Sequence, residues 1–482
     1  MDITNLKAWE IREKILNKEI SSYEVTEQFL EKIDEVEDEI NAFITIDADR
    51  ALDEAKKVDE KIAQGIEIGI LAGLPVAVKD NIMTKNLRTT CASKMLEKYI
   101  PPYNATVVEK IKKEDGIIIG KTNMDEFAMG GSTETSYFGI TRNPRNKSIV
   151  PGGSSGGSAA AIAANEAALS LGTDTGGSIR QPASYCGVVG IKPTYGLVSR
   201  FGVVPMSNSL DQVGVFGKDV KDAYLALKSI AGFDPHDATS SKRAKLEELN
   251  FDEVSLKGLK IALPKEYDEL RVKGDEKIRV VFENSIRVFE RNGAKIEYVS
   301  LPYLKYALET YYLISTAEVS TNLSRFDGIR YGHRAFEYKT LDELYINSRT
   351  EGFGEETKRR IMMGTYALSQ GYKDEHYKKA LKIRTLIKND YDRIFKDYDV
   401  ILSITSPILP FPFDSVINSP VDMYKADTYT VPVNLAGLCA ISVPMGEVDS
   451  LPVGLQITAN RFNEKTLFTA AYGYERSAND EL

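Results

Sequence analysis

Residues 151–183 of the chain read PGGSSGGSAAAIAANEAALSLGTDTGGSIRQPA, with two Gly-Gly-Ser turns around an Ala-rich segment. On its own, a Gly/Ser-rich loop is typical of a flexible linker. Here the first loop runs directly into a segment of small apolar residues, where an ordered turn is expected. We therefore predict ordered Gly-rich turns on either side of a buried helix over 159–169.

Outward from this stretch, from residue 66 on, short apolar runs bounded by Gly and Pro alternate with helical patterns. Such alternation favours an α/β layered fold around a parallel or mixed sheet. The candidate strands are 74–78, 117–119, 188–191, 260–263, 296–299, 400–404, 440–443 and 454–458.

Residues 1–65 read as helices. Ser21 and Glu24 have the spacing of a capping box, and Gly65 stands where a second helix should end. The apolar faces of these helices must be buried, so we expect the segment to pack on the main body or on a partner.

The remainder, 66–482, shows no domain boundary and is expected to form one domain. One helix follows Gly274 and ends near Gly293, and the stretch 303–396 is nearly all helical in pattern. These helices add to the layered body rather than forming a repeat.

The charge balance of the 482 residues is acidic, with 61 Lys and Arg against 70 Asp and Glu, a formal net charge of −9. An acidic chain is a poor candidate for direct binding to nucleic-acid phosphates, although a partner can supply a basic surface.

Cysteine and histidine are both scarce, with three of each in the chain. No CxxC or Cys/His cluster occurs, so neither a metal site nor a disulfide framework is expected. The start lacks the layout of a signal peptide, and no run approaches the ~18 apolar residues of a membrane span. A reducing, cytoplasmic location fits.

Three familiar motifs fit poorly. Residues 152–156 match the Gly-x-Ser-x-Gly elbow of α/β-hydrolases, but any Gly/Ser-rich loop can do so, and a histidine base would still be needed. Residues 116–122 end in Gly-Lys-Thr with one residue too few for a phosphate loop, and their isoleucines read as a strand. Asp2 stands where an N-terminal cysteine nucleophile would be required. The histidines available to a hydrolase triad are His236, His333 and His376.

The second Gly-rich turn, 172–178, has more specific chemistry. Consecutive backbone N–H groups in such a turn can converge on a developing oxyanion, here those of Thr175, Gly176 and Gly177. Ser178 at the end of the turn could attack the carbonyl whose oxygen they bind. A serine nucleophile needs a base, and with so few histidines a lysine is the obvious substitute.

Lys79 is the candidate base because it stands at the end of an apolar run, 74–78. A lysine base must be neutral near pH 7, which requires burial or cationic neighbours. From spacing alone, however, an exposed strand-end lysine paired with Asp80 is the commoner arrangement.

Together, the Lys79 strand, the GGSSGGS loop and the DTGGSIR turn resemble the amidase signature family, whose members use a Ser–cis-Ser–Lys triad. The resemblance implies that Ser178 is the nucleophile, Ser154 the bridging serine and Lys79 the base. It also implies an α/β/α sandwich around a large mixed sheet, with added helices. The elbow pattern at Ser154 is then a coincidence.

Within that family the chain is most similar to the glutaminase subunits of tRNA-dependent amidotransferases. The resemblance to these subunits implies that the chain hydrolyses glutamine and delivers ammonia to a B subunit. That subunit would use ATP and Mg²⁺ to amidate Glu-tRNA(Gln) or Asp-tRNA(Asn). A small C subunit is also implied. The B subunit would also make most of the tRNA contacts, and this chain would need no cofactor of its own.

Glutamine is a zwitterion, so its pocket should offer a cation and an anion. The resemblance points to the run 358–360 and to Asp427, with Met129 as a further pocket residue. Of the two adjacent arginines we predict Arg359, because only one of them can readily face a pocket, and an arginine fork suits a carboxylate.

The chain departs from the pattern of that subfamily at Gly131 and at Cys439, where Ser and Pro are expected. Both positions lie near the pocket in the family, so the departures bear on pocket shape and not on the triad. Two other functions stay open: a stand-alone amidase for small amides, and a catalytically silent scaffold, which the intact Lys79, Ser154 and Ser178 set disfavours.

Overall fold

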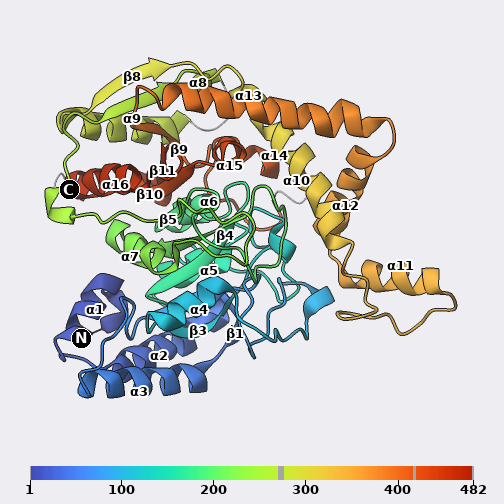
Figure 1. Ribbon diagram of the computed structural model, residues 1–482, viewed down its shortest axis with the longest axis horizontal. Helices are drawn as coiled ribbons and strands as arrows, with labels where there is room; N and C mark the ends of the chain where they lie inside the picture. Colours follow the sequence, from blue (N-terminus) through green and yellow to red (C-terminus); the bar gives the residue numbers. More distant parts are fainter. Residues whose placement is uncertain (1, 270–275, 416–419, 480–482) are drawn as a thin grey trace.

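The computed structural model describes residues 2–269, 276–415 and 420–479. Within these residues eleven strands form one mixed sheet, in the order β1-β3-β2-β4-β6-β5-β10-β11-β9-β7-β8 (Figure 1). The strands are β1 (Phe43–Ile46), β2 (Pro75–Lys79), β3 (Ile117–Thr122), β4 (Leu169–Asp174), β5 (Val189–Lys192), β6 (Gln212–Gly217), β7 (Lys260–Pro264), β8 (Lys295–Val299), β9 (Val400–Ile404), β10 (Cys439–Val448) and β11 (Leu451–Ala459).

The α-helices of the described residues surround this sheet (Figure 1). They are α1 (Ala8–Leu16), α2 (Ser22–Ile40), α3 (Ala48–Ala63), α4 (Thr106–Lys113), α5 (Gly156–Ala163), α6 (Arg180–Cys186), α7 (Val220–Ile230), α8 (Glu266–Glu269), α9 (Glu276–Arg291), α10 (Ala307–Leu323), α11 (Leu341–Gly352), α12 (Glu355–Leu368), α13 (Lys378–Ile394), α14 (Pro420–Lys425), α15 (Val431–Ala436) and α16 (Glu464–Asn479). No helix among the described residues is long and apolar enough to cross a membrane.

The sheet is covered on both faces, as the alternation of side chains along β2 shows. Val76 and Val78 belong to one core cluster, with Val107 of α4, whereas Ala77 belongs to another, with Ala159 of α5. Because successive strand residues point to opposite faces, helices lie on both sides of β2. This confirms the expected α/β/α sandwich around a large mixed sheet.

All eight predicted strands are present, but β1, β4 and β6 were not predicted. The predicted helix over 159–169 is wrong at both ends. It begins earlier, at Gly156, and it ends at Ala163, after which Asn165 adopts a left-handed conformation with φ of 62°. Leu169 then opens β4 instead of closing the helix.

The N-terminal segment holds α1, α2, α3 and the unpredicted strand β1. The capping box is confirmed: the Glu24 N–H donates to Ser21 Oγ at 3.1 Å, and the Ser21 N–H donates to Glu24 Oε2 at 2.8 Å. Gly65 follows α3 with a positive φ of 68°. β1 pairs antiparallel with β3, so the segment occupies one edge of the sheet (Figure 1).

The stretch 303–396 contains α10, α11, α12 and α13, but residues 324–340 form no helix, so the stretch is less helical than its pattern predicted. α10 and α12 pack tightly, because a Cβ on Gly364 would lie 1.9 Å from the Thr316 carbonyl oxygen. Figure 1 shows α11 at the end of a lobe that projects from the body. The predicted start of the helix at Gly274 lies outside the described residues, and its end, at Arg291, agrees with the expectation.

Candidate active site

Lys79 lies at the carboxyl end of β2, beside the carboxyl end of the parallel strand β4. Its side chain is fully buried. Nζ contacts three hydroxyls: Ser154 Oγ at 2.8 Å, Ser155 Oγ at 2.7 Å and Thr173 Oγ1 at 3.0 Å. A lysine so enclosed is held in one place by groups that can both accept and donate protons.

Burial lowers the pKa of Lys79 to about 7, although the carboxylates of Asp125, Asp174 and Asp211 act in the opposite direction. At neutral pH a large fraction of the amine is therefore uncharged and can accept a proton. A surface pair with Asp80 is excluded, because Asp80 is itself buried and lies 3.7 Å from Lys121 Nζ.

The first Gly-rich turn places Ser154 and Ser155 beside Lys79. The Gly153–Ser154 peptide is cis, and Ser155 is the N-cap residue of α5. Glycine is required next to them: a Cβ on Gly157 would lie 2.5 Å from the main-chain oxygens of both Ala42 and Asn123. The start of α5 can approach Ala42 and Asn123 this closely only because Gly157 has no side chain.

The second turn carries Ser178 and lies against the first. The Ser155 N–H donates to the Ser178 carbonyl oxygen at 3.2 Å. Ser178 is 9% exposed, whereas Ser154 is fully buried. The structure thus brings the two turns and Lys79 together, with Ser178 as the more accessible of the two predicted serines.

The Asp174 carboxylate organises this turn. It accepts from the N–H groups of Gly177 at 2.9 Å and Ile179 at 3.2 Å, and from the guanidinium of Arg180. Burial would raise the pKa of Asp174, but Arg180, with Lys192 and Asn434, lowers it to about 2. The ion pair that pins the turn is therefore intact throughout the neutral pH range.

The predicted oxyanion donors differ in availability. The Gly177 N–H is already taken by Asp174, whereas the N–H groups of Gly176 and Ser178 make no hydrogen bond to another described residue. The Thr175 hydroxyl donates to Asp211 at 2.7 Å, which fixes the start of the turn. The N–H groups of Thr175, Gly176 and Ser178 are thus the ones that make no hydrogen bond to another described residue in this conformation.

Asp427 lies next to the same turn. Thr430 Oγ1 contacts both the Asp427 carbonyl oxygen and, at 2.6 Å, that of Gly176. The carboxylate accepts from Tyr312 Oη at 2.9 Å. Burial raises the pKa of Asp427 to about 7, and Arg360 opposes that rise.

Arg360, rather than Arg359, is the buried arginine of α12. Its side chain is 4% exposed, it donates to Glu356 at 2.8 Å, and its guanidinium lies 5.5 Å from the ring centres of Tyr312 and Tyr424. Arg359 also pairs with Glu356, but its side chain is 44% exposed. The structure therefore places Arg360, and not the predicted Arg359, beside the tyrosine that holds Asp427.

Met129 and the two residues that depart from the family pattern, Gly131 and Cys439, are all buried. Met129 is fully buried in a cluster that includes Phe127 and Met206. Gln181 Nε2 donates to the Gly131 carbonyl oxygen at 2.9 Å, and its Oε1 accepts from Gly153, so Gly131 is tied to the first turn. Cys439 is a buried residue of β10.

Sequence reasoning missed Thr173 and Tyr312, and it preferred Arg359 to its neighbour Arg360. Thr173 stands within the quoted turn, but its strand, β4, was not predicted, so its place beside the Lys79 strand could not be read from the sequence. Tyr312 has no signal in the sequence, because it is one of many tyrosines in a helical stretch.

Two of the histidines are engaged elsewhere. His236 Nδ1 lies 2.9 Å from Asp234, and His333 Nε2 lies 2.7 Å from Glu351. Among the described residues, no three His, Cys, Asp or Glu side chains gather as a metal site would require. The arrangement supports lysine-based chemistry.

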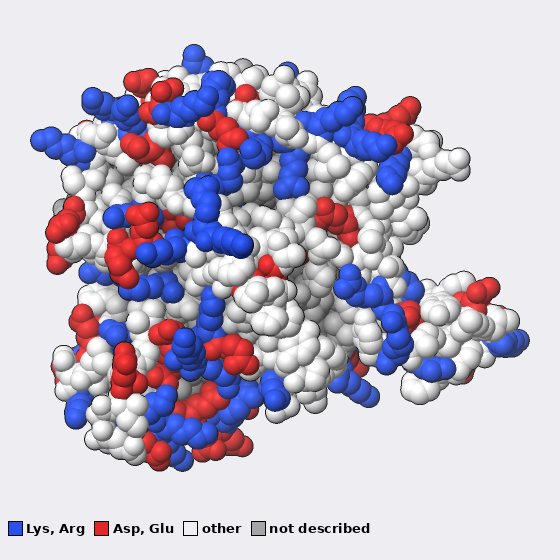
Figure 2. Space-filling model, viewed as in Figure 1, with Lys and Arg blue, Asp and Glu red and all other residues white. Residues whose placement is uncertain are grey.

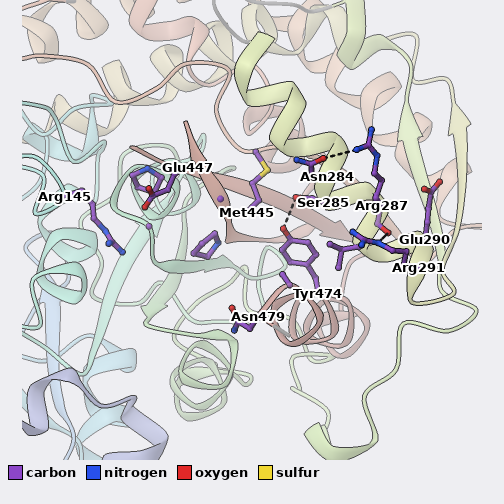
Figure 3. A pocket seen from close by; sticks show the side chains of 16 residues that line it. Arg145, Asn284, Ser285, Arg287, Glu290, Arg291, Met445, Glu447, Tyr474 and Asn479 are labelled. Carbon is purple, nitrogen blue, oxygen red and sulfur yellow. Dashed lines mark hydrogen bonds between the residues drawn. The ribbon is translucent and has the colours of Figure 1, made fainter. Parts of the chain in front are cut away.

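A pocket away from Lys79 lies between α9, α16 and the β10–β11 hairpin (Figure 3). Its volume is about 1060 Å³, and its walls carry Arg145, Arg287, Arg291 and Tyr474. None of the described residues that line this pocket is Lys79 or one of the residues that Lys79 contacts. The pocket is therefore not the candidate active site, despite its volume.

A fully buried lysine against two Gly-Ser turns, at the carboxyl ends of strands in a covered mixed sheet, is the arrangement expected from the resemblance to the amidase signature family. The family model described as Amidase matches residues 24–468. The chain belongs to the amidase signature family.

Curated relatives narrow the comparison. The A subunit of the glutamyl-tRNA(Gln) amidotransferase of Caldanaerobacter subterraneus subsp. tengcongensis is 54% identical over 477 residues, which cover 99% of this chain and 97% of that protein. The protein of the same name from Thermoanaerobacter pseudethanolicus is also 54% identical, with the same coverage.

Solved structures agree with the fold. The crystal structure of the corresponding A subunit from Thermotoga maritima is 40% identical and matches with a TM-score of 0.81, covering 99% of this chain and 95% of that one. A peptide amidase from Stenotrophomonas maltophilia, 28% identical, matches with a TM-score of 0.83, covering 98% and 97%.

Proposed function

We propose that the chain is the glutaminase subunit of a tRNA-dependent amidotransferase that converts Glu-tRNA(Gln), or Asp-tRNA(Asn), to its amide. The observation that carries this proposal is the buried, readily deprotonated Lys79 in contact with Ser154, beside the turn that ends in Ser178. The relatives at 54% identity over nearly the whole chain support the choice of substrate system.

In the proposed reaction, Ser178 Oγ attacks the side-chain amide carbon of glutamine while its proton passes through Ser154 to Lys79. The amides of Gly176 and Ser178, with that of Thr175, hold the oxyanion. When the carbon–nitrogen bond breaks, Lys79 returns the proton through Ser154 to the leaving nitrogen, which departs as ammonia. Water, deprotonated by the same lysine, then hydrolyses the γ-glutamyl ester to glutamate and restores Ser178.

Glutamine would be held by Arg360 at its α-carboxylate and by Asp427 at its α-ammonium. Arg360 replaces the predicted Arg359 because it is buried beside Tyr312, which binds Asp427. Met129 would be a further residue of the glutamine pocket.

The ammonia would be used by a B subunit, which binds ATP and Mg²⁺ and makes most of the tRNA contacts, with a C subunit completing a cytoplasmic heterotrimer. The net charge of −9 supports this division. In the face shown in Figure 2, basic and acidic side chains are interspersed, which is a poor surface for tracking a phosphate backbone.

Ammonia release from glutamine, measured with and without B and C subunits, tests the proposal. Ser178→Ala and Lys79→Ala should each lower kcat by at least about 100-fold, because each removes a catalytic group. Release should rise when partners and charged tRNA are added. Full turnover of many small neutral amides without partners would instead support a stand-alone amidase.

A further inference from the structure

Asn81 is a buried amide that the proposed mechanism does not use. It lies two residues after Lys79 and is 3% exposed. Its main-chain carbonyl oxygen accepts from the Val204 N–H at 2.9 Å, which fixes the backbone. Its side-chain Nδ2 donates to Thr173 Oγ1 at 3.0 Å, the same oxygen that accepts from Lys79 Nζ at 3.0 Å.

These contacts determine whether the Thr173 hydroxyl donates a hydrogen bond to Lys79 or accepts one from it. An amide nitrogen can only donate, so one lone pair of Thr173 Oγ1 is occupied by Asn81 and the other faces Lys79. The Ser155 hydroxyl donates to the Thr173 carbonyl oxygen at 3.1 Å, so its proton is committed and it can only accept from Lys79. A neutral amine donates twice and accepts once. With Ser155 and Thr173 as acceptors, the lone pair of Lys79 is left for the hydroxyl of Ser154.

The surroundings make the charge at position 81 important. Three carboxylates, Asp125, Asp174 and Asp211, already act on Lys79 from different elements. Behind Asn81 lies a cavity of about 10 Å³, lined also by Arg200 and Asp211, with room for about one water. Asn81 Oδ1 has no hydrogen-bond partner among the described residues. With so little solvent, a change of charge here is weakly screened.

We propose that Asn81 is a positioning residue for the base: its amide fixes the Thr173 hydroxyl as an acceptor for Lys79 and adds no further negative charge next to that of Asp211. The inference rests on the proposed function, in which Lys79 takes the proton of Ser178 through Ser154.

The test uses Asn81→Asp and Asn81→Ala in the assembled amidotransferase, with kcat for ammonia release at saturating glutamine followed against pH. The parent should lose activity as pH falls through about 7, since protonated Lys79 cannot act as a base. Asn81→Asp places a carboxylate within reach of Lys79, favours its charged form and should move this acidic limb up by about one pH unit or more. Asn81→Ala should lower kcat by about tenfold without moving the limb upward.

Asn322→Ala is the matched control, because Asn322 is also a buried asparagine, whose Nδ2 donates to the Met206 carbonyl oxygen at 3.0 Å. Asn322→Ala should leave the acidic limb of the pH–kcat profile at the parental pH. The inference is overturned if Asn81→Asp keeps the parental limb and Asn81→Ala keeps kcat within about twofold. Failure of the proposed function is distinguishable, since Lys79→Ala and Ser178→Ala would then retain activity.

Discussion

At the scale of single residues, the adjacent arginines of α12 show that a sequence motif does not decide which of two neighbouring side chains faces the interior. Successive residues of a helix point about 100° apart, so only one of Arg359 and Arg360 can face the interior. The phase of the helix decides which, and the phase follows from the packing of α12 against α10. In the fold, Arg360 is buried and Arg359 is largely exposed.

Arg360→Ala is therefore expected to raise the KM for glutamine by at least about 100-fold, because leaving a buried partner charge uncompensated costs ~3–5 kcal/mol. Arg359→Ala on the same helix is the control and should change KM by less than about threefold. Steady-state kinetics with glutamine and with a neutral ester separate binding from folding. Equal losses on both substrates in Arg360→Ala would show a structural role only.

The catalytic candidates themselves could be predicted from sequence, because Lys79, Ser154 and Ser178 stand in motifs with fixed order. The burial of Lys79 could not, since it depends on β3 and β4 lying on either side of β2. Nor could the loss of the Gly177 amide to Asp174, which depends on how the turn folds.

At the scale of elements, the two central strands that sequence analysis missed share a cause. β4 and β6 contain Gly172 and Gly214, which weaken a strand pattern. Both glycines are needed: a Cβ on Gly172 would lie 2.7 Å from the Phe216 ring, and one on Gly214 would lie 2.1 Å from the Ile191 carbonyl oxygen. The close packing of β4 and β6 therefore requires glycines, and these glycines weaken the sequence pattern by which the two strands could have been predicted.

The second turn, which ends in Ser178, leads to a prediction at the same scale. Gly177 has φ of 135°, and a Cβ there would lie 2.4 Å from Thr430 Oγ1. Gly177→Ala should displace the turn and its oxyanion donors and lower kcat by about 100-fold or more, as loss of an oxyanion donor does. The measurement is kcat for ammonia release, together with the melting temperature.

Gly258→Ala is the matched control, because Gly258 also has a positive φ, of 83°, but nothing lies within 4 Å of its Cβ position. It carries backbone strain without the clash. If both variants kept the parental kcat, the close approach of Thr430 to the turn would have no catalytic importance.

At the scale of the whole molecule, the order of strands in the sheet shows how the site depends on distant parts of the chain. β2, β3 and β4 run parallel next to one another, and β1 covers the outer edge of β3. The family match begins at residue 24, inside the N-terminal segment that the sequence suggested as an addition. We propose that residues 1–65 are an integral part of the body that holds Lys79.

Deleting residues 1–65 is therefore expected to abolish the stable monomer. The deletion would leave the β3 edge unpaired and would uncover apolar core residues that share a cluster with Val25 and Phe29 of α2, both fully buried. Exposed strand edges and apolar patches favour aggregation. Size-exclusion chromatography and thermal unfolding should show aggregates or no cooperative transition.

Two single substitutions in α2 test whether the packing of this helix, and not only the presence of residues 1–65, stabilises the fold. Phe29→Ala should lower the free energy of unfolding by about 3–5 kcal/mol, the usual cost of emptying a buried phenylalanine site. Glu31→Ala, two residues further on the exposed face, should change it by less than about 0.5 kcal/mol. The segment would be dispensable, against our proposal, if the shortened chain remained monomeric with the parental melting temperature and Phe29→Ala were as mild as Glu31→Ala. In that case the edge of β3 would have to be protected by the other chains of the assembly, and the isolated chain and the assembled enzyme would differ in which variants they tolerate.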